Sequence, residues 1–558
     1  MQRRLWKLIP LTVVVLLFSA SLHNLLSAEE TTETVAPPPE QPFAIVAVAS
    51  IERMLHALDF SFEAADRMAA SEAIGGYMEK AGDLKGMDHR QGFGVMIFLA
   101  GITPEPIGFV PVENINDLLK TIEIGPFTTK KIDDEHYELK RNGDSVFVKT
   151  VGRYAFFSND ETALDREFPA PSPMTAGLAA EYDVAAMLNL ASLPDDKREI
   201  FATLLKASAD TNLQRRDNEP ESAHRVRKAL GENNARLLEQ VLRQSQDLTV
   251  GWKMLPQQRK AALEIRIRAK PGSELATIYG ELQTGRSQFT NFLKGDTPLT
   301  FASTWNLDKP GQEAFGEIVQ VLEDSIPAAG EVDAADDPVA RLFRAARGTV
   351  AAGELDLAMR FLGEPGGPFV LAGGLKVKDG RAMTEGLSEL CLYWLETGAF
   401  SDVEIDADEH NGIQFHRLDI RDGGGGGSER VYGGPPSMYL GVDDTTLWMA
   451  VGGDTALPRL FEQIDALAEP VDQPQPAVPL QFLVNIADWT SLRDDDDGDE
   501  NNRGGRFFER VNEAFTQDNA ALRVDIKSIK DGVRLRLEFE EGFIRFFGMS
   551  VARRMMRE

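Results

Sequence analysis

The chain has 558 residues, and 43% of them are apolar, which is ample for several packed cores. Its net charge is −29 at pH 7, and a field of this sign repels nucleic acid and anionic lipid. These values disfavour a nucleic-acid-binding role and favour a soluble body or a cationic partner.

The first 28 residues have the order of a secretory signal peptide. Three cations at residues 3–7 precede the apolar run 8–22, and Leu26-Ser27-Ala28 places a small residue at a cleavage position. We therefore expect residues 1–28 to be removed on export to the periplasm, cell envelope or exterior. Because Leu26 is not the ideal small residue, an uncleaved N-terminal anchor is the alternative. Cleavage would remove Arg3, Arg4 and Lys7 and take the net charge from −29 to −32.

Proline-rich breaks divide the rest of the chain into four segments, because such stretches are where domain boundaries usually fall. A polar tether occupies residues 29–42. The predicted units are A1 at 43–168, B1 at 178–290, A2 at 297–467 with a glycine-rich insertion at 422–435, and B2 at 479–558 with an acidic loop at 493–505.

Each unit begins with an apolar strand followed by a candidate helix-capping residue. Serine and aspartate suit this position because their side-chain oxygens accept amide hydrogens of the first helical turn. The four predicted strands with their caps are 44–49 with Ser50, 184–191 with Ser192, 300–307 with Asp308, and 482–487 with Asp488.

The units also resemble each other pairwise. In A1 and A2, residues 132–136 resemble residues 405–410, and residues 154–164 resemble residues 447–457. In B1 and B2, alternating apolar and polar residues predict antiparallel hairpins, at 248–252 with 262–267 and at 521–526 with 533–538. We therefore expect an α+β fold of tandem duplicated units, mainly antiparallel, in an A-B-A-B arrangement. Chance similarity between hairpins is the alternative.

The alternation gives each predicted sheet one apolar and one polar face. Such a sheet must cover its apolar face with helices or with a neighbouring sheet, which predicts a packed body. The one cysteine, Cys391, lies in an apolar helical context and is predicted to be a buried, inert thiol.

The sequence contains no Gly-x-Ser-x-Gly, His-Glu-x-x-His, Walker lysine loop or Cys-x-x-Cys. The strongest metal-like signal is the acidic run 494–500, with Asp495, Asp497 and Asp499 as weak candidate ligands. An EF-type loop aligned on Gly498 would place Arg493 and Gly504 at ligand positions, so a solvated loop is the favoured interpretation. No cofactor is expected.

His410 and His416 are two further weak metal candidates. They flank Asn411-Gly412, a strong hairpin-turn signal, so His410 is expected at the tip and His416 on the returning strand. A closed zinc site needs three or four convergent ligands, and a polar hairpin is therefore the favoured interpretation.

The C-terminal segment 543–557 is a basic, aromatic helix that either docks on its own unit or contacts a membrane surface. Apart from this helix and the N-terminal segment, no membrane contact is expected. The leading functional hypothesis is a non-enzymatic exported scaffold or binding protein with an envelope protein or polymer as its partner. The alternatives are a carrier of an apolar ligand such as lipid, and a hydrolase with dispersed acidic residues.

Overall fold

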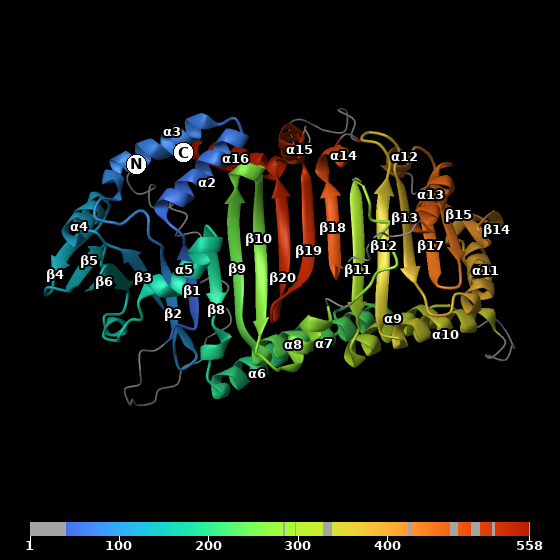
Figure 1. Cartoon of the computed structure of the whole chain (residues 1–558), viewed down its shortest axis with the longest axis horizontal. Helices are drawn as coiled ribbons and strands as arrows, with labels where there is room; N and C mark the ends of the chain where they lie inside the picture. The colour runs from blue at the N-terminus through green and yellow to red at the C-terminus, as the bar shows by residue number, and fades with distance from the viewer. Residues whose placement is uncertain are drawn as a thin grey trace. The chain divides into compact units, whose positions relative to one another are not determined.

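Antiparallel strands with helices at their ends make up most of the protein (Figure 1). The computed structural model describes residues 41–282, 285–295, 297–326, 337–421, 427–468, 478–490, 492, 503–515 and 519–556. The signal peptide predicted at 1–28 and the tether up to residue 40 lie outside these residues. The described chain divides into two units, unit 1 within residues 1–200, 245–267 and 544–558, and unit 2 within 201–244 and 268–543.

Unit 1 contains an antiparallel sheet. From one edge, its strands are β4 (Thr128–Lys131), β5 (His136–Arg141), β6 (Asp144–Val151), β7 (Tyr154–Ser158), β3 (Thr103–Pro111), β2 (Phe93–Ala100), β1 (Ala44–Val48), β8 (Val184–Leu188), β9 (Ser245–Leu255) and β10 (Lys260–Ala269). Its helices include α2 (Ile51–Ala64), α3 (Met68–Lys80), α4 (Ile115–Ile124) and α5 (Pro171–Glu181).

Unit 2 contains a second antiparallel sheet. Its strands are, in spatial order, β14 (Phe400–His410), β15 (Ile413–Ile420), β16 (Ser437–Val442), β17 (Thr446–Gly452), β13 (Val370–Lys376), β12 (Glu354–Leu362), β11 (Leu299–Asn306), β18 (Leu480–Asn485), β19 (Ala521–Ile529) and β20 (Gly532–Glu540). Its helices include α7 (Glu221–Gln244), α8 (Glu274–Glu281), α9 (Lys309–Asp324), α10 (Pro338–Ala351), α11 (Arg381–Glu396), α12 (Gly427–Tyr432), α13 (Ala456–Ala468), α14 (Ile486–Thr490) and α15 (Arg503–Ala514).

The predicted α+β class with mainly antiparallel sheet is confirmed. The two sheets have the same strand order, so that β1 corresponds to β11, β2 to β12, and so on to β10 and β20. The segments predicted as A1 and A2 supply β1–β7 and β11–β17, and those predicted as B1 and B2 supply β8–β10 and β18–β20. A duplication would produce this correspondence.

The compact units do not follow the predicted segment boundaries. Helix α7 lies within the predicted segment B1 but belongs to compact unit 2. The same is true of α6 (Asp195–Asn212) from residue 201 onwards. Within unit 2, the Arg225 guanidinium on α7 lies 2.6 Å from Glu317 and 2.6 Å from Asp324 on α9. Ion pairs between positions so far apart in sequence explain why local patterns do not reveal this packing.

Two of the four predicted helix caps are confirmed and two are wrong. The hydroxyl of Ser50 accepts the amide hydrogen of Arg53 at the start of α2, and Asp308 accepts that of Gly311 at the start of α9. Ser192 instead ends a short 3₁₀ turn that Asn189 caps, because α6 begins only at Asp195. Asp488 lies inside α14 and is buried, because this helix starts at Ile486, three residues earlier than predicted.

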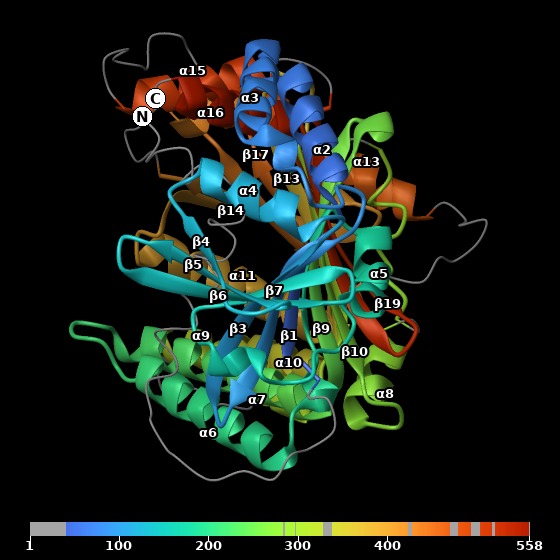
Figure 2. The same cartoon turned by 90° about the vertical axis from the view of Figure 1, so that its left-hand side faces the viewer.

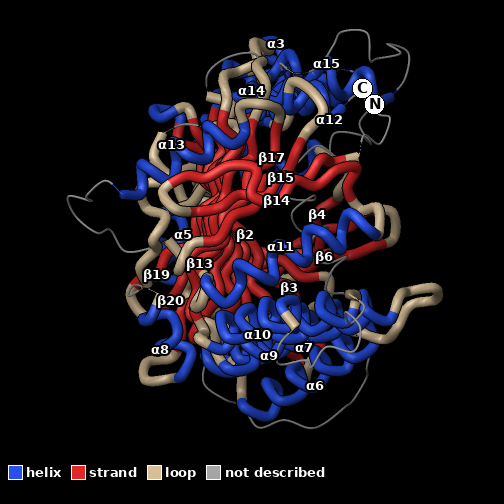
Figure 3. Tube along the Cα trace, turned by 90° about the vertical axis from the view of Figure 1, so that its right-hand side faces the viewer, coloured by secondary structure: helices blue, strands red, loops and turns tan. Residues whose placement is uncertain are grey.

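Helices pack on both faces of each sheet. In unit 1, α5 covers the face that carries Ile45 and Phe98, and α4 covers the opposite face near Val148 (Figure 2). In unit 2, α13 and α11 have the same relation to the β13–β17 region (Figure 3). Two predicted loops are shorter than expected, since Gly427–Tyr432 form α12 and α15 begins at Arg503. Residues 422–426 and 493–502 of those loops lie outside the described residues.

The C-terminal helix α16 (Glu541–Met556) buries Ile544, Met549 and Ala552 in the protein interior. Ala552 is fully buried against Phe62 and Ala70 of unit 1, and the Arg545 Nε–H donates to the Ala64 carbonyl at 3.0 Å. Phe547 is half exposed. The helix therefore docks, but on residues of the predicted segment A1 and not on its own segment B2 as predicted.

A close approach in unit 1 makes the backbone at Gly251 sensitive to substitution. A Cβ atom there would lie 2.3 Å from the Tyr182 ring, and Tyr182 is itself 2% exposed. We expect Gly251→Ala to lower the free energy of unfolding by about 1–3 kcal/mol, as overpacking does. Chemical denaturation measures the change.

Gly177 in α5 provides the control, because nothing lies within 4 Å of a Cβ added there. Gly177→Ala is expected to raise stability by roughly 0.5–1 kcal/mol, since alanine favours the helix. Equal effects of the two substitutions would contradict the packing of Tyr182 over β9.

Candidate functional site

The residues first proposed as metal ligands do not form a common site in the described structure. Asp495, Asp497 and Asp499 lie outside the described residues. In the part of the chain that the structure describes, no group of three or more histidine, cysteine, aspartate or glutamate side chains is arranged to hold a metal ion. Within the same residues, no helix combines the length and apolar character needed to cross a bilayer.

His410 and His416 both lie on the predicted hairpin, but they contact different residues. Asn411 and Gly412 have φ angles of 52° and 81°, and they connect β14 to β15 as a two-residue turn. The His410 ring stacks on Phe461 at 4.1 Å, and its Nε2 lies 2.8 Å from Asp465. The hydrogen bond from His410 lowers the pKa of Asp465.

His416 is a buried, neutral side chain. Its Nδ1 accepts the Asp406 amide hydrogen at 3.1 Å, so that Nε2 carries the proton and donates to the Ser388 hydroxyl at 3.1 Å. Burial lowers the pKa of His416, although the charge of Asp406 opposes this effect. Nε2 therefore joins β15 to α11, and Nδ1 joins β15 to β14.

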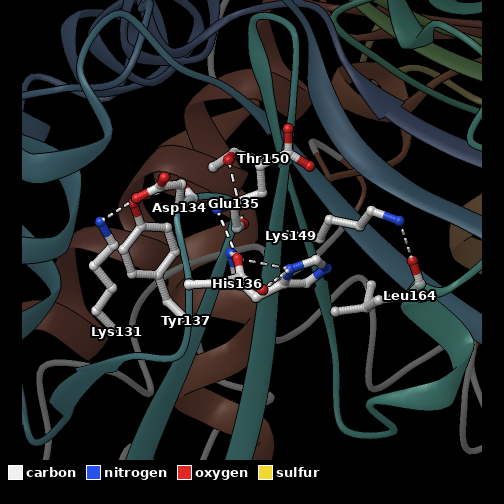
Figure 4. A network of polar contacts seen from close by, with 9 residues as sticks. Lys131, Asp134, Glu135, His136, Tyr137, Lys149, Thr150 and Leu164 are labelled. Atoms are coloured by element: carbon white, nitrogen blue, oxygen red, sulfur yellow. Dashed lines mark hydrogen bonds and ion pairs between the residues drawn. The ribbon is translucent and has the colours of Figure 1, made fainter.

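The related hairpin of unit 1 forms a wider, polar turn between β4 and β5 (Figure 4). Asp133 accepts the amide hydrogens of Glu135 and His136, each at 2.8 Å, and lies 2.9 Å from the His136 ring. These hydrogen bonds lower the pKa of Asp133. The resembling segments 132–136 and 405–410 thus lie at the same strand connection, but one forms a turn and the other ends a strand.

The residue pattern singles out a different surface, on the sheet of unit 2. Strands β11, β12 and β18–β20 present one face made almost wholly of large apolar side chains. We define the unit 2 apolar face as Leu299, Phe301, Trp305, Leu355, Leu357, Met359, Phe361, Leu480, Phe482, Val484, Leu522, Val524, Ile526, Leu535, Leu537 and Phe539.

Strand register places these side chains in rows across the sheet. One row runs through Met359, Phe301, Phe482, Val524 and Leu537, which are directly opposite one another on neighbouring strands. The adjacent rows are Phe361, Leu299, Val484, Leu522 and Phe539, and Leu357, Ser303, Leu480, Ile526 and Leu535. Ser303 is the polar member of these rows, and its hydroxyl donates to the Pro479 carbonyl at 3.3 Å.

These side chains are only half-buried, whereas the opposite face of β11, β12 and β18 contains buried residues. Every residue of the unit 2 apolar face has intermediate exposure, whereas Ala302, Ala358 and Leu483 on the other face are buried. A sheet normally covers its apolar face, so a half-buried apolar surface over five neighbouring strands is a candidate interaction site.

Helices border this face at both ends of its strands. Helices α9 and α10 connect β11 to β12 at one end, and α14 and α15 follow β18 at the other. Figure 3 shows α15 and the α9–α10 pair on the α11 side of the sheet, which is the side of the apolar face. At the α14 end, the Trp489 ring lies 5.0 Å from that of Phe361 and forms an aromatic border.

The other face of β19 and β20 carries alternating charges. Arg536 lies 2.8 Å from Glu538, Arg523 lies 3.4 Å from Glu540, and Arg534 lies 3.6 Å from Asp525. Such pairs are compatible with water, so this side needs no cover. The strands therefore separate a polar side from an apolar side that lacks charged groups.

Unit 1 contains a buried ionic cluster around Glu264 on β10. This carboxylate accepts hydrogen bonds from Lys253 at 3.0 Å, Arg266 at 2.9 Å and Tyr182 at 3.0 Å. Burial alone would raise the pKa of Glu264, but the hydrogen bond and charge of Lys253, with the bonds from Tyr182 and Arg266, lower it to about 2. Burial raises the pKa of Tyr182. A carboxylate held ionised in this way is unsuited to act as a general acid.

A groove of about 210 Å³ lies between α6 and α7 in unit 2. It is lined by Leu205, Lys206, Ala209, Asp210, Leu213, Glu232, Ala235, Arg236 and Glu239. Arg236 is paired with Asp308 at 2.6 Å, and the remaining polar side chains lie along a small apolar strip. The groove therefore lacks the converging polar groups of a catalytic site.

Comparison with the models of known protein families, with curated proteins and with solved structures finds no match.

The sequence predicted part of the unit 2 apolar face. Alternation at 521–526 and 533–538 predicted the β19–β20 hairpin and its two unlike faces, and the hairpin is confirmed. We expected helices or another sheet to cover the apolar face. Coverage depends on where distant helices pack, and alternation within a strand does not contain that information.

Acid titration tests the Glu264 cluster. The folded pKa of about 2 lies below the ordinary value of 4.5, so the ionised carboxylate stabilises the fold fully above pH 4.5. This contribution is lost as pH falls toward 2. We expect Glu264→Gln to cost about 3 kcal/mol at neutral pH, because Lys253 and Arg266 lose their shared buried partner. The variant should also lose stability less steeply in acid.

Glu181→Gln is the matched control, because Glu181 pairs with the same Arg266 but its side chain is 48% exposed. Urea denaturation across the pH range measures both effects. An unchanged acid dependence in Glu264→Gln would show that the carboxylate is not held ionised.

Cys391 is buried as predicted, with 0% exposure, and burial raises the pKa of its thiol to about 12. We expect a thiol reagent to label the folded protein at least about a hundredfold more slowly than the unfolded protein, because the thiolate is the reactive form. Absorbance of the released product measures the rate. Rapid labelling of the folded protein would contradict this burial.

Proposed function

We propose that this chain is an exported, non-enzymatic binding protein that holds a lipid acyl chain against the unit 2 apolar face. The observation that supports the proposal is the set of half-buried apolar rows across β12, β11, β18, β19 and β20. Export is proposed on the N-terminal sequence pattern, and the absence of intact catalytic motifs from the sequence supports a binding role.

The dimensions of the face suit an acyl chain. Five strands with a spacing of about 4.8 Å make a row roughly 19 Å long. The hydrocarbon core of a bilayer is about 30 Å thick, so one leaflet contributes chains roughly 15 Å long. A single extended chain therefore fits along one row of apolar side chains.

The chemistry of the face favours a chain without hydrogen-bonding groups. All five strands except β20 have neighbours on both sides within unit 2, so their backbone groups are already paired. A peptide would leave polar backbone groups against this surface, at a cost in desolvation. The net charge of −29 favours a zwitterionic lipid over an anionic one.

Val524, in the middle of β19, is the position at which we test binding. We expect Val524→Glu to weaken the binding of phosphatidylcholine by at least about tenfold, because an unpaired carboxylate against an acyl chain costs more than about 1.4 kcal/mol. Native mass spectrometry after incubation with phosphatidylcholine vesicles measures the bound lipid.

Lys527→Gln is the matched control, because Lys527 lies on the polar face of the same strand and is exposed. Its lipid binding should equal that of the wild type, and thermal unfolding verifies that both variants fold. A wild-type protein that binds no lipid but retains an envelope protein would favour the scaffold hypothesis instead.

A further inference from the structure

The central row of the unit 2 apolar face continues beyond its five strands. From Met359 on β12, the strand register leads to Gly373 on β13, Met449 on β17, Leu440 on β16 and His416 on β15. Helices α10 and α11 cover this continuation and pack with it in one core cluster. The same sheet surface is therefore half-buried over five strands and closed by helices over the next ones.

His416, at the end of this row, is a polar ring within the apolar cover. It is 2% exposed, and in the described residues it belongs to no metal-ligating group. Its Nδ1 accepts the Asp406 amide hydrogen and its Nε2 donates to the Ser388 hydroxyl, each at 3.1 Å. The Ser388 hydroxyl donates in turn to the Thr384 carbonyl within α11 at 3.4 Å. Both partners therefore require the neutral ring with its proton on Nε2.

The ring holds an irregular part of β14 in place. Asp406 has a left-handed φ of 53°, and the pairing of β14 with β15 shifts between Glu404 and Asp408. Within the described residues, β14 pairs with β15 alone, so its amides have fewer neighbours than those of a central strand. The bulge at Asp406 therefore depends on the acceptor that Nδ1 of His416 provides.

The groups around the ring favour its neutral form. From β14, the Asp406 carboxylate lies 3.5 Å from Nδ1, but its side chain is 58% exposed. From α11, the ring meets Ser388, and Cys391 one turn further has a thiol pKa raised to about 12 by burial and stays neutral. From β16, Leu440 lies opposite. Burial lowers the pKa of His416 more than the charge of Asp406 raises it.

The direction of the pH effect follows from this pKa. The ordinary pKa of the ring is 6.5, and in the closed structure it is lower. The hydrogen bonds of neutral His416 therefore stabilise the closed structure fully above pH 6.5. As pH falls below this value, a released ring takes up a proton that the closed site resists, and the closed structure loses stability.

We propose that His416 is an acid-sensitive latch whose protonation releases α11 and the bulge of β14. Protonation places a hydrogen on Nδ1, which then faces the Asp406 amide N–H, and neither group can accept the other's hydrogen. The buried amide loses its acceptor at a cost that the closed structure must bear. Local opening at this edge of the sheet relieves that conflict.

Release of α11 enlarges the unit 2 apolar face. It uncovers apolar side chains on β13, β16 and β17 that continue the rows of that face, namely Leu375, Leu440, Leu447 and Met449. Acid thereby exposes more apolar area for a ligand. The gain in lipid binding rests on the proposed function, whereas the latch itself does not.

Cys391 reports the release of α11, because it is the one cysteine of the chain and is fully buried on this helix. The test measures labelling of the intact folded protein with a dipyridyl disulfide, which reacts with thiols in weak acid. Each rate is divided by that of the urea-unfolded protein at the same pH. We expect this ratio to rise at least about fivefold between about pH 7.5 and about pH 5.

His416→Gln removes the titrating group but keeps an amide donor and a carbonyl acceptor, so it should abolish the rise. His410→Gln is the matched control on the same hairpin, because His410 stacks on Phe461 of α13 and does not contact α11. It should keep the rise. No rise in the wild type, or an equal rise in His416→Gln, overturns the latch.

Hydrogen exchange of the wild type decides the question if His416→Gln does not fold, as thermal unfolding shows. Loss of protection in β14 over the same pH range, with β12 still protected, supports the latch, and unchanged protection of β14 overturns it. These assays contain no lipid. A protein that shows the rise but binds no phosphatidylcholine therefore keeps the latch and overturns the proposed function.

Discussion

Side-chain alternation along hydrogen-bonded antiparallel strands is the constraint on which the rest of this protein depends. Backbone pairing fixes the register, and register sends every second residue to the same face. In β19 and β20 this places Val524 beside Leu537 and, on the other side, Asp525 beside Arg536. Helices can then cover only part of each face, and the remainder has a chemical character that the strands themselves determine.

The two faces of each sheet differ in how their side chains are stabilised. Charged groups find partners within the sheet, as Glu264 does with Lys253 and Arg266. Apolar groups have no equivalent pairing and depend on area removed from water. Covering the half-buried row that includes Phe301 and Phe482 with an apolar ligand would thus remove further apolar area from water and lower the free energy. Covering the polar side would gain little. The proposed binding face is on the side without charges for this reason.

Sequence patterns correctly predicted the turns and helix caps that depend on residues close together in the chain. The turn at Asn411 and Gly412 followed from two adjacent residues, and the caps at Ser50 and Asp308 from side chains near their own amides. The cap assigned to Asp488 failed because α14 starts within the strand-like stretch before it. The apolar face was predicted as a face but not as a half-buried one, since its exposure depends on how helices such as α9 and α15, distant in sequence, are placed.

The docking of α16 affects when the protein can finish folding. Arg545 bonds to the carbonyl of Ala64, which is 481 positions earlier in the chain, and Ala552 fills a site between Phe62 and Ala70. The sheet of unit 1 is likewise incomplete until β9 and β10 have been synthesised, because these strands follow the long helices α6 and α7 in the chain. The first unit to leave the ribosome is therefore the last to close. A nascent chain therefore remains without its completed N-terminal core until its final helix emerges.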